Sequence, residues 1–177
     1  MTPWALFTDG SLDPRSRIGF GAYIAAPTSE LPTVPPVSAV VVKRFEHTSS
    51  SQLELQALLW ALDNVAAPDR HLSIHTDSQT IVGLPARRSK LEESQFTSRQ
   101  GRPLSNRALY RKFFDALDHG NVTLHKVRGH RPQKEKTQLE RWFGLVDRAA
   151  RSALRQATAT GVAGAARPDR PTPSEAD

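Results

Sequence analysis

The stretch Trp4–Ser11, WALFTDGS, is an apolar segment that runs directly into an acidic, glycine-containing turn signal. Its first six residues have the length and apolar content of a buried β-strand, and the sequence Asp-Gly-Ser is typical of a turn that ends a strand. The same pattern recurs at residues 72–76, a predicted strand that is followed by Asp77. The sequence therefore predicts two strands that each end at an aspartate, Asp9 and Asp77.

Around these two segments, the hydrophobic pattern predicts further strands and helices. The predicted elements are strands at 4–9, 20–26, 37–45, 72–76 and 122–127, helices at 52–66, 105–119 and 137–156, and a helix that starts at Gln79 and is broken near Pro85. Three strands, a helix and then alternating strands and helices are typical of an α/β fold. We expect a five-stranded mixed sheet flanked by helices.

The composition is that of a globular domain with a basic charge balance. The chain has 177 residues, 38% of them hydrophobic, a formal net charge of +6, and no cysteine. The lack of cysteine excludes disulfides and thiolate metal sites, and a positive charge suits a polyanionic partner such as nucleic acid, although charge alone does not establish one. We expect a monomeric, cytoplasmic domain over 1–157, a disordered tail over 158–177, and no membrane span.

Two further carboxylates lie on predicted helix faces that are otherwise apolar. Glu54 shares its helix face with the apolar residues Leu58, Ala61, Leu62 and Val65. Asp147 shares its helix face with the apolar residues Phe143, Ala150 and Leu154. A carboxylate in such a place is costly unless its charge is compensated. Taken alone, each is better explained by a salt bridge or a rim position, and the two strand-end aspartates by turn capping.

Taken together, the four carboxylates predict a metal site. The carboxyl ends of strands in an α/β sheet gather ligand sites, and the two helical carboxylates could converge there. Four negative charges at one point repel one another unless cations neutralise them, and ligation by carboxylate oxygens suits Mg²⁺ or Mn²⁺. Two such ions about 3.5–4 Å apart are a known arrangement for phosphodiester displacement.

Six segments, in order, make the chain resemble the ribonuclease H superfamily, and bacterial ribonuclease HI in particular. They span most of residues 4–155 and are FTDGS (Phe7–Ser11), QLELQALLWAL (Gln52–Leu62), HTDSQ (His75–Gln79), PLSNRALY (Pro103–Tyr110), VRGH (Val127–His130) and VDRAAR (Val146–Arg151). The resemblance implies a ribonuclease H-like fold. It also implies endonucleolytic hydrolysis of the RNA strand of RNA–DNA hybrids, with 5′-phosphate and 3′-hydroxyl products.

The resemblance also implies roles for individual residues. Asp9, Glu54, Asp77 and Asp147 would bind two Mg²⁺ ions, with Mn²⁺ as a substitute, to activate the attacking water and stabilise the leaving 3′ oxygen. His130 would help proton transfer or product release, although a surface-loop histidine is the alternative. Contacts to the hybrid, whose 2′-hydroxyls distinguish RNA from DNA, are implied for Gly10, Ser11, Ser50, Ser51, Gln52 and Gln79. The basic segment 86–112 either holds phosphates or is a solvated charged face.

The sequence departs from the family pattern in two places. Ser50 and Ser51 stand where many members have paired asparagines, and Gln52 replaces a common arginine. The segment between His130 and the last aspartate is longer than usual, which leaves Glu140 as a substitute for Asp147 as the fourth ligand. Two alternatives to hybrid cleavage stay open: a related nuclease that acts on DNA, such as a resolvase or exonuclease, and a non-catalytic hybrid-binding module.

Overall fold

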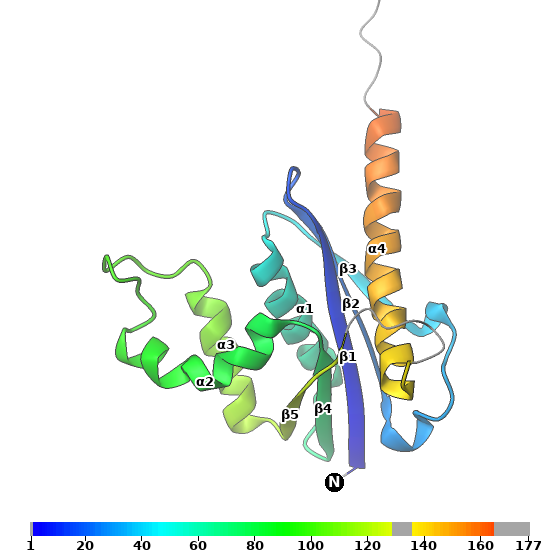
Figure 1. Ribbon diagram of the computed structural model, residues 1–177, viewed down its shortest axis with the longest axis horizontal. Helices are drawn as coiled ribbons and strands as arrows, with labels where there is room; N and C mark the ends of the chain where they lie inside the picture. The colour runs from blue at the N-terminus through cyan, green and yellow to red at the C-terminus, as the bar shows by residue number, and fades with distance from the viewer. Residues whose placement is uncertain (1, 129–135, 165–177) are drawn as a thin grey trace, which may run out of the picture.

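Figure 1 shows the computed structural model of the chain, which describes residues 2–128 and 136–164. In this part of the chain, five strands form one mixed sheet in the order β3-β2-β1-β4-β5. The antiparallel half contains β1 (Thr2–Asp13), β2 (Ile18–Pro27) and β3 (Val41–Phe45), and the parallel half adds β4 (Arg70–Thr76) and β5 (Val122–Lys126) to β1. The predicted five-stranded mixed sheet is confirmed.

Helices cover both faces of the sheet. One apolar core joins the sheet to α1 (Ser50–Val65), α2 (Gln79–Glu93) and α3 (Arg107–His119), and the other joins it to α4 (Gln138–Gly164) (Figure 1). Alternate residues of β1 serve the two cores, since Leu6 packs with the first group of helices and Phe7 packs against α4. None of the helices in the described residues has the length and apolar character needed to cross a membrane.

Two predicted strand boundaries were wrong. β1 does not end at the Asp9-Gly10-Ser11 signal but continues to Asp13, and the turn lies at residues 14–17. Gly10 pairs with Gly21 of β2, so strand pairing outweighs the local preference of this tripeptide for a turn. The strand predicted at 37–45 starts only at Val41, because residues 37–39 form a short 3₁₀ helix after a pair of prolines.

Two helix boundaries also differ from the prediction. α2 is not broken near Pro85 but continues to Glu93, because it buries Ile81, Leu84 and Leu91 along one face on both sides of the proline. α4 runs beyond the predicted end at Gln156 to Gly164, so the first part of the predicted tail at 158–177 is helical and not disordered. The other described helices agree with the prediction to within two residues at each end. Ser49 caps the start of α1, because its hydroxyl accepts a hydrogen bond from the Gln52 amide.

Glycines allow α1 to approach the sheet closely. A Cβ atom on Gly10 would lie 2.9 Å from Leu53 Cγ, and one on Gly19 would lie 2.6 Å from Leu53 Cδ2. Any other residue at these positions would force the Leu53 side chain to shift. The two glycines therefore let Leu53, the residue before Glu54, pack directly on β1 and β2.

Candidate active site

The site begins where β1 runs past the end of β4. The last parallel pair between the two strands is Phe7 with His75, and β4 ends at Thr76. Asp9 and Asp77 each follow that pair by two residues, so they lie side by side at the edge where β4 stops. The prediction that both aspartates end strands was right for Asp77 and wrong for Asp9, which lies inside β1.

The carboxylates from four elements of the fold line one cleft. Asp9 comes from β1, Glu54 from the N-terminal part of α1, Asp77 from the loop after β4, and Asp147 from α4. The cleft has a volume of about 460 Å³, and its lining consists of Asp9, Gly10, Ser11, Leu12, Ser50, Leu53, Glu54, Asp77, Asp147 and Arg151. The structure thus brings together all four carboxylates that the sequence analysis selected.

The electrostatics of the cleft favour a bound cation. Burial, followed by the charge of Asp77, raises the pKa of Asp9 to about 7. Burial also raises the pKa of Glu54, against the opposing effect of a hydrogen bond from Ser78. Burial and neighbouring negative charges disfavour the ionised form of such a carboxyl group. A bound cation stabilises that ionised form, so it relieves the unfavourable electrostatic free energy of the cleft. The oxygen-only ligands of this cleft fit Mg²⁺ or Mn²⁺.

Two of the carboxylates are held by neighbours that the sequence analysis missed. The Ser78 hydroxyl donates to Glu54 Oε2 at 2.5 Å, and Arg151 Nε lies 2.6 Å from Asp147 Oδ1. The spacing of four residues between Asp147 and Arg151 on one helix was a usable signal. Among the described residues, no three acidic or histidine side chains are already gathered as they would be around one ion. The bonds of Glu54 to Ser78 and of Asp147 to Arg151 are consistent with the carboxylates not being gathered around one point.

The predicted hybrid contacts divide into two groups. Gly10, Ser11 and Ser50 line the cleft. The other three lie outside its lining. Ser51 Oγ accepts from Asn106 Nδ2 at 3.4 Å, Gln52 Oε1 accepts from the hydroxyl of the N-cap Ser49 at 3.3 Å, and Gln79 Oε1 accepts from the Lys126 ammonium. His130 lies outside the described residues.

Glu140, the substitute fourth ligand, has a structural role in the described part of the chain. Its side chain is buried, and Glu140 Oε2 accepts from the Thr137 amide at 2.7 Å, while the Glu140 amide donates to Thr137 Oγ1 at 3.3 Å. These reciprocal bonds form a capping box at the start of α4. Glu140 does not line the cleft, whereas Asp147 does.

Replacing Ser78 with alanine should lower the affinity for Mg²⁺ about ten- to hundredfold, as is usual when a partner that orients a metal ligand is lost. The change frees Glu54 to rotate away from the cleft. Calorimetric titration of the protein with Mg²⁺ measures the effect, and Ser78→Thr, which keeps a hydroxyl, should restore most of the affinity.

Ser78 also caps α2, because its hydroxyl accepts from the Ile81 amide at 3.2 Å. Ser49→Ala is therefore the matched control: it removes an equivalent cap from α1, worth about 1 kcal/mol, without touching a carboxylate. Equal losses of Mg²⁺ affinity in Ser78→Ala and Ser49→Ala would show that helix destabilisation alone is responsible.

Comparison with known proteins bears on the family and the fold. The family model described as RNase H matches residues 2–154. Similar solved structures include LC9-RNase H1, a type 1 RNase H with the type 2 active-site motif, which has a TM-score of 0.64, 17% identity, and coverage of 88% of this chain and 73% of that one. The prototype foamy virus protease–reverse transcriptase has a TM-score of 0.63 at 18% identity, with coverage of 84% of this chain and 20% of that one. The PFV RNase H domain has a TM-score of 0.58 at 15% identity, with coverage of 85% and 92%. None of the curated proteins compared matches the chain. At these identities, the structural likenesses show the fold.

Proposed function

Because the chain belongs to the ribonuclease H family, we propose that it is an endonuclease that hydrolyses the RNA strand of RNA–DNA hybrids and leaves 5′-phosphate and 3′-hydroxyl ends. The observation that carries this proposal is the convergence of Asp9, Glu54, Asp77 and Asp147 from four separate elements on one cleft. A structural or protein-binding domain has no need for four carboxylates there, because their mutual repulsion opposes folding.

The four carboxylates would hold two divalent cations, Mg²⁺ or Mn²⁺. When bound, such ions supply activation of a water molecule and stabilisation of the leaving oxygen. Ser78 fixes the direction of Glu54, and the ion pair with Arg151 holds Asp147 at the cleft. We assign to His130 the transfer of a proton or the release of product, because a histidine side chain ordinarily titrates near neutrality.

We propose that Gly10, Ser11 and Ser50 contact the minor groove of the hybrid beside the carboxylates. The hydroxyls of the two serines can exchange hydrogen bonds with the 2′-hydroxyl groups that distinguish RNA from DNA. Ser51, Gln52 and Gln79 would contact the hybrid only at the margin of the cleft.

Exposed arginines of the 86–112 segment would hold phosphates farther out. The exposed ones are Arg87, Arg99, Arg102, Arg107 and Arg111. Arg88 is less suited to this task because it is bound to Glu92 and Asp118 through bonds of 2.6–2.7 Å. We further propose that the protein acts as a monomer and that residues 1–157 suffice for the reaction.

In the decisive experiment, the protein is incubated with Mg²⁺ and an end-labelled RNA–DNA hybrid, with duplex DNA and duplex RNA as parallel substrates. We expect fragments of the RNA strand from the hybrid alone, with 5′-phosphate ends that a phosphatase can remove. Cleavage of duplex DNA but not of the hybrid would identify a DNA nuclease on the same fold. Binding of the hybrid without cleavage, under Mg²⁺ and under Mn²⁺, would identify a non-catalytic module.

A further inference from the structure

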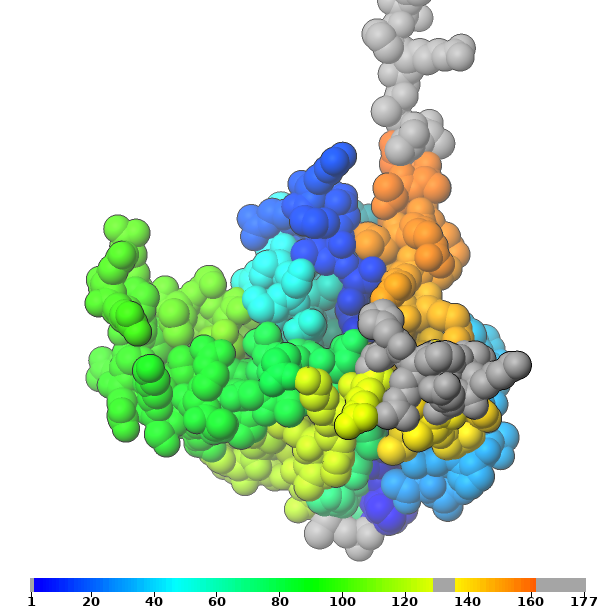
Figure 2. All heavy atoms as spheres, in the orientation of Figure 1, coloured from blue at the N-terminus to red at the C-terminus, as the bar shows by residue number. Residues whose placement is uncertain are grey.

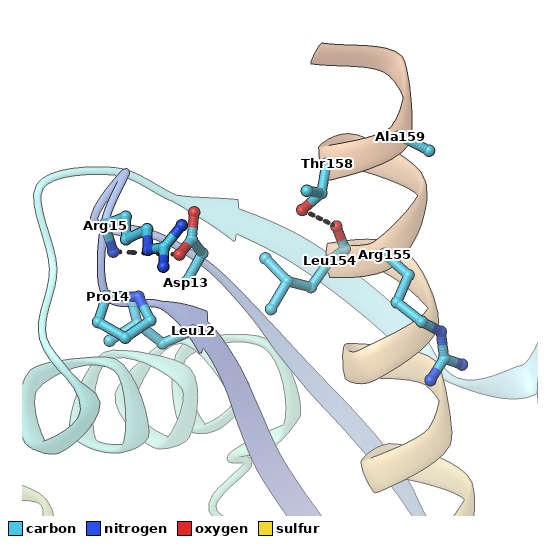
Figure 3. Close-up of a pocket in the computed structure, with 8 residues that line it drawn as sticks. All are labelled: Leu12, Asp13, Pro14, Arg15, Leu154, Arg155, Thr158 and Ala159. Carbon is cyan, nitrogen blue, oxygen red and sulfur yellow. Dashed lines mark hydrogen bonds between the residues drawn. The ribbon is translucent and has the colours of Figure 1, made fainter. Parts of the chain in front are cut away.

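A second and larger groove lies between the tip of the β1–β2 hairpin and the C-terminal half of α4. Its volume is about 830 Å³, and its lining consists of Leu12, Asp13, Pro14 and Arg15 on the hairpin and Leu154, Arg155, Thr158 and Ala159 on α4 (Figure 3). The hairpin and the helix both rise above the rest of the molecule and stand side by side (Figures 1 and 2). None of the residues predicted to act in catalysis or substrate binding belongs to this groove.

The groove continues the carboxylate cleft. Leu12 lines both the cleft and the groove. On the hairpin, the lining residues run from Asp9 in the cleft to Arg15 in the groove, and on α4 they run from Asp147 in the cleft to Ala159 in the groove. At a rise of about 1.5 Å per residue, that length of helix spans roughly 18 Å. A nucleic-acid strand advances about 3.4 Å per nucleotide, so the joined clefts have room for roughly five nucleotides.

The walls of the groove combine apolar surface with cations. Leu154 points across the gap toward the hairpin, where Leu12 and Pro14 lie (Figure 3). Arg15 is exposed at the hairpin tip, and the exposed Arg155 follows Arg151 by four residues, so the two α4 arginines lie one turn apart on the same side of the helix. In Figure 3 the guanidinium of Arg155 extends away from the hairpin, on the outer side of α4, so this exposed side chain reaches a strand in the groove by turning around the helix.

The acidic residue of the groove, Asp13, is already engaged within its own turn. Its carboxylate accepts from the Arg15 amide at 3.1 Å, from the Ser16 amide at 3.3 Å and from the Ser16 hydroxyl at 2.7 Å. These three bonds stabilise its negative charge locally and lower its pKa. Within the groove itself, two arginines, Arg15 and Arg155, stand against one aspartate, Asp13, so positive charge prevails there.

We propose that this groove binds the sugar–phosphate backbone of the strand that passes through the carboxylate cleft, and thereby extends the substrate footprint beyond the site of cleavage. The inference rests on the proposed function, because the strand must first occupy the cleft. Sugars and base edges pack on the apolar residues of the groove, and phosphates approach the arginines at its rim. The helical extension of α4 past the predicted end at Gln156 supplies Thr158 and Ala159, two of the four α4 residues that line the groove.

The test measures hybrid binding by fluorescence anisotropy in an Asp9→Asn background, which prevents cleavage during the measurement. The double variant Arg15→Gln/Arg155→Gln should bind a hybrid of about 20 base pairs roughly tenfold more weakly. The slope of its affinity against salt concentration should fall by up to about 1.8, since each lost phosphate contact contributes about 0.9. The matched control Arg44→Gln/Arg141→Gln removes the same charge from exposed positions outside both clefts and should change binding less than twofold.

A substitution that adds a positive charge to the groove distinguishes a loss of phosphate contacts from damage to the fold. Thr158→Lys adds a cation to the exposed α4 wall of the groove and should tighten binding severalfold. Equal affinities for the Arg15/Arg155 variant, the control variant and the parent would overturn the proposal. A change in sedimentation behaviour without a change in hybrid binding would also overturn it, and would assign the groove to contact between copies of the chain. Failure of the unaltered protein to cleave any hybrid would instead contradict the proposed function.

Discussion

Replacing Asp9 with asparagine should reduce hybrid cleavage by at least about a thousandfold, which corresponds to roughly 4 kcal/mol of transition-state stabilisation. Asp9 lines the cleft, and the charges of two other carboxylates, Asp77 and Asp147, both raise its pKa. Asparagine keeps the shape of the side chain but removes the charge that would bind a divalent cation. Single-turnover cleavage of a labelled hybrid measures the loss, and a variant that retains a tenth of the parental rate would contradict the mechanism.

The same substitution should make the metal-free protein more stable at alkaline pH. The pKa of Asp9 is about 7 in the folded protein, whereas the ordinary pKa of an aspartate is 3.8. Well below pH 3.8 the carboxyl is protonated in both the folded and the unfolded protein, so it does not change the free energy of unfolding. As the pH rises to 7, the unfolded chain releases its proton first, so folding stability falls. The full shift corresponds to at most about 4 kcal/mol, of which we expect about 1–2 kcal/mol after solvent screening.

Urea unfolding in the presence of EDTA, at pH 4.5 and at pH 8, tests this expectation. Asp9→Asn should gain stability over the parent at pH 8 and show little difference at pH 4.5. Mg²⁺ should stabilise the parent at pH 8 and have a weaker effect on the variant. Asp13→Asn is the control of opposite sign, because hydrogen bonds within its turn lower the pKa of Asp13, and this variant should lose stability at pH 8. An Asp9→Asn protein that is less stable than the parent at pH 8 would show that Asp9 has a structural role.

The four carboxylates could be selected from the sequence because each interrupts a regular pattern. Glu54 stands out against the apolar stripe of α1, and the residues that share its predicted face, such as Leu58 and Leu62, are indeed buried. Periodicity is a local property, so it could be evaluated without the tertiary structure. The five-stranded mixed sheet also followed, because three strands, a helix and alternating elements leave few topologies.

Features that depend on distant parts of the chain could not be predicted in the same way. The Asp9-Gly10-Ser11 tripeptide favours a turn when it is isolated, but pairing with β2 keeps it in a strand. The bond between Ser78 and Glu54 joins residues 24 positions apart, and no spacing rule connects them. The groove beside the hairpin tip exists only because α4 continues past Gln156 alongside a hairpin that is itself longer than expected. Each of these features depends on packing between elements, which a single sequence does not encode in any short window.

The fourth carboxylate can be identified by a pair of substitutions whose effects should separate completely. Asp147→Asn should reduce cleavage by about a hundredfold or more and leave the metal-free protein folded, because it removes a negative charge from the cleft. Glu140→Ala should leave the rate of the folded enzyme within a few-fold of the parent but lower its stability by about 1 kcal/mol, because it removes half of the capping box that starts α4.

Glu140→Gln refines the comparison, since glutamine can also complete a capping box and should therefore preserve stability as well as activity. Arg151→Gln serves as the partner control for Asp147: it breaks the 2.6 Å ion pair but keeps the carboxylate, so its effect on cleavage should be smaller than that of Asp147→Asn. If Glu140→Gln abolished cleavage while Asp147→Asn retained it, the fourth ligand would be Glu140. The start of α4 would then have to rearrange when the metal binds, because in the described structure the Glu140 carboxylate is committed to its own helix terminus.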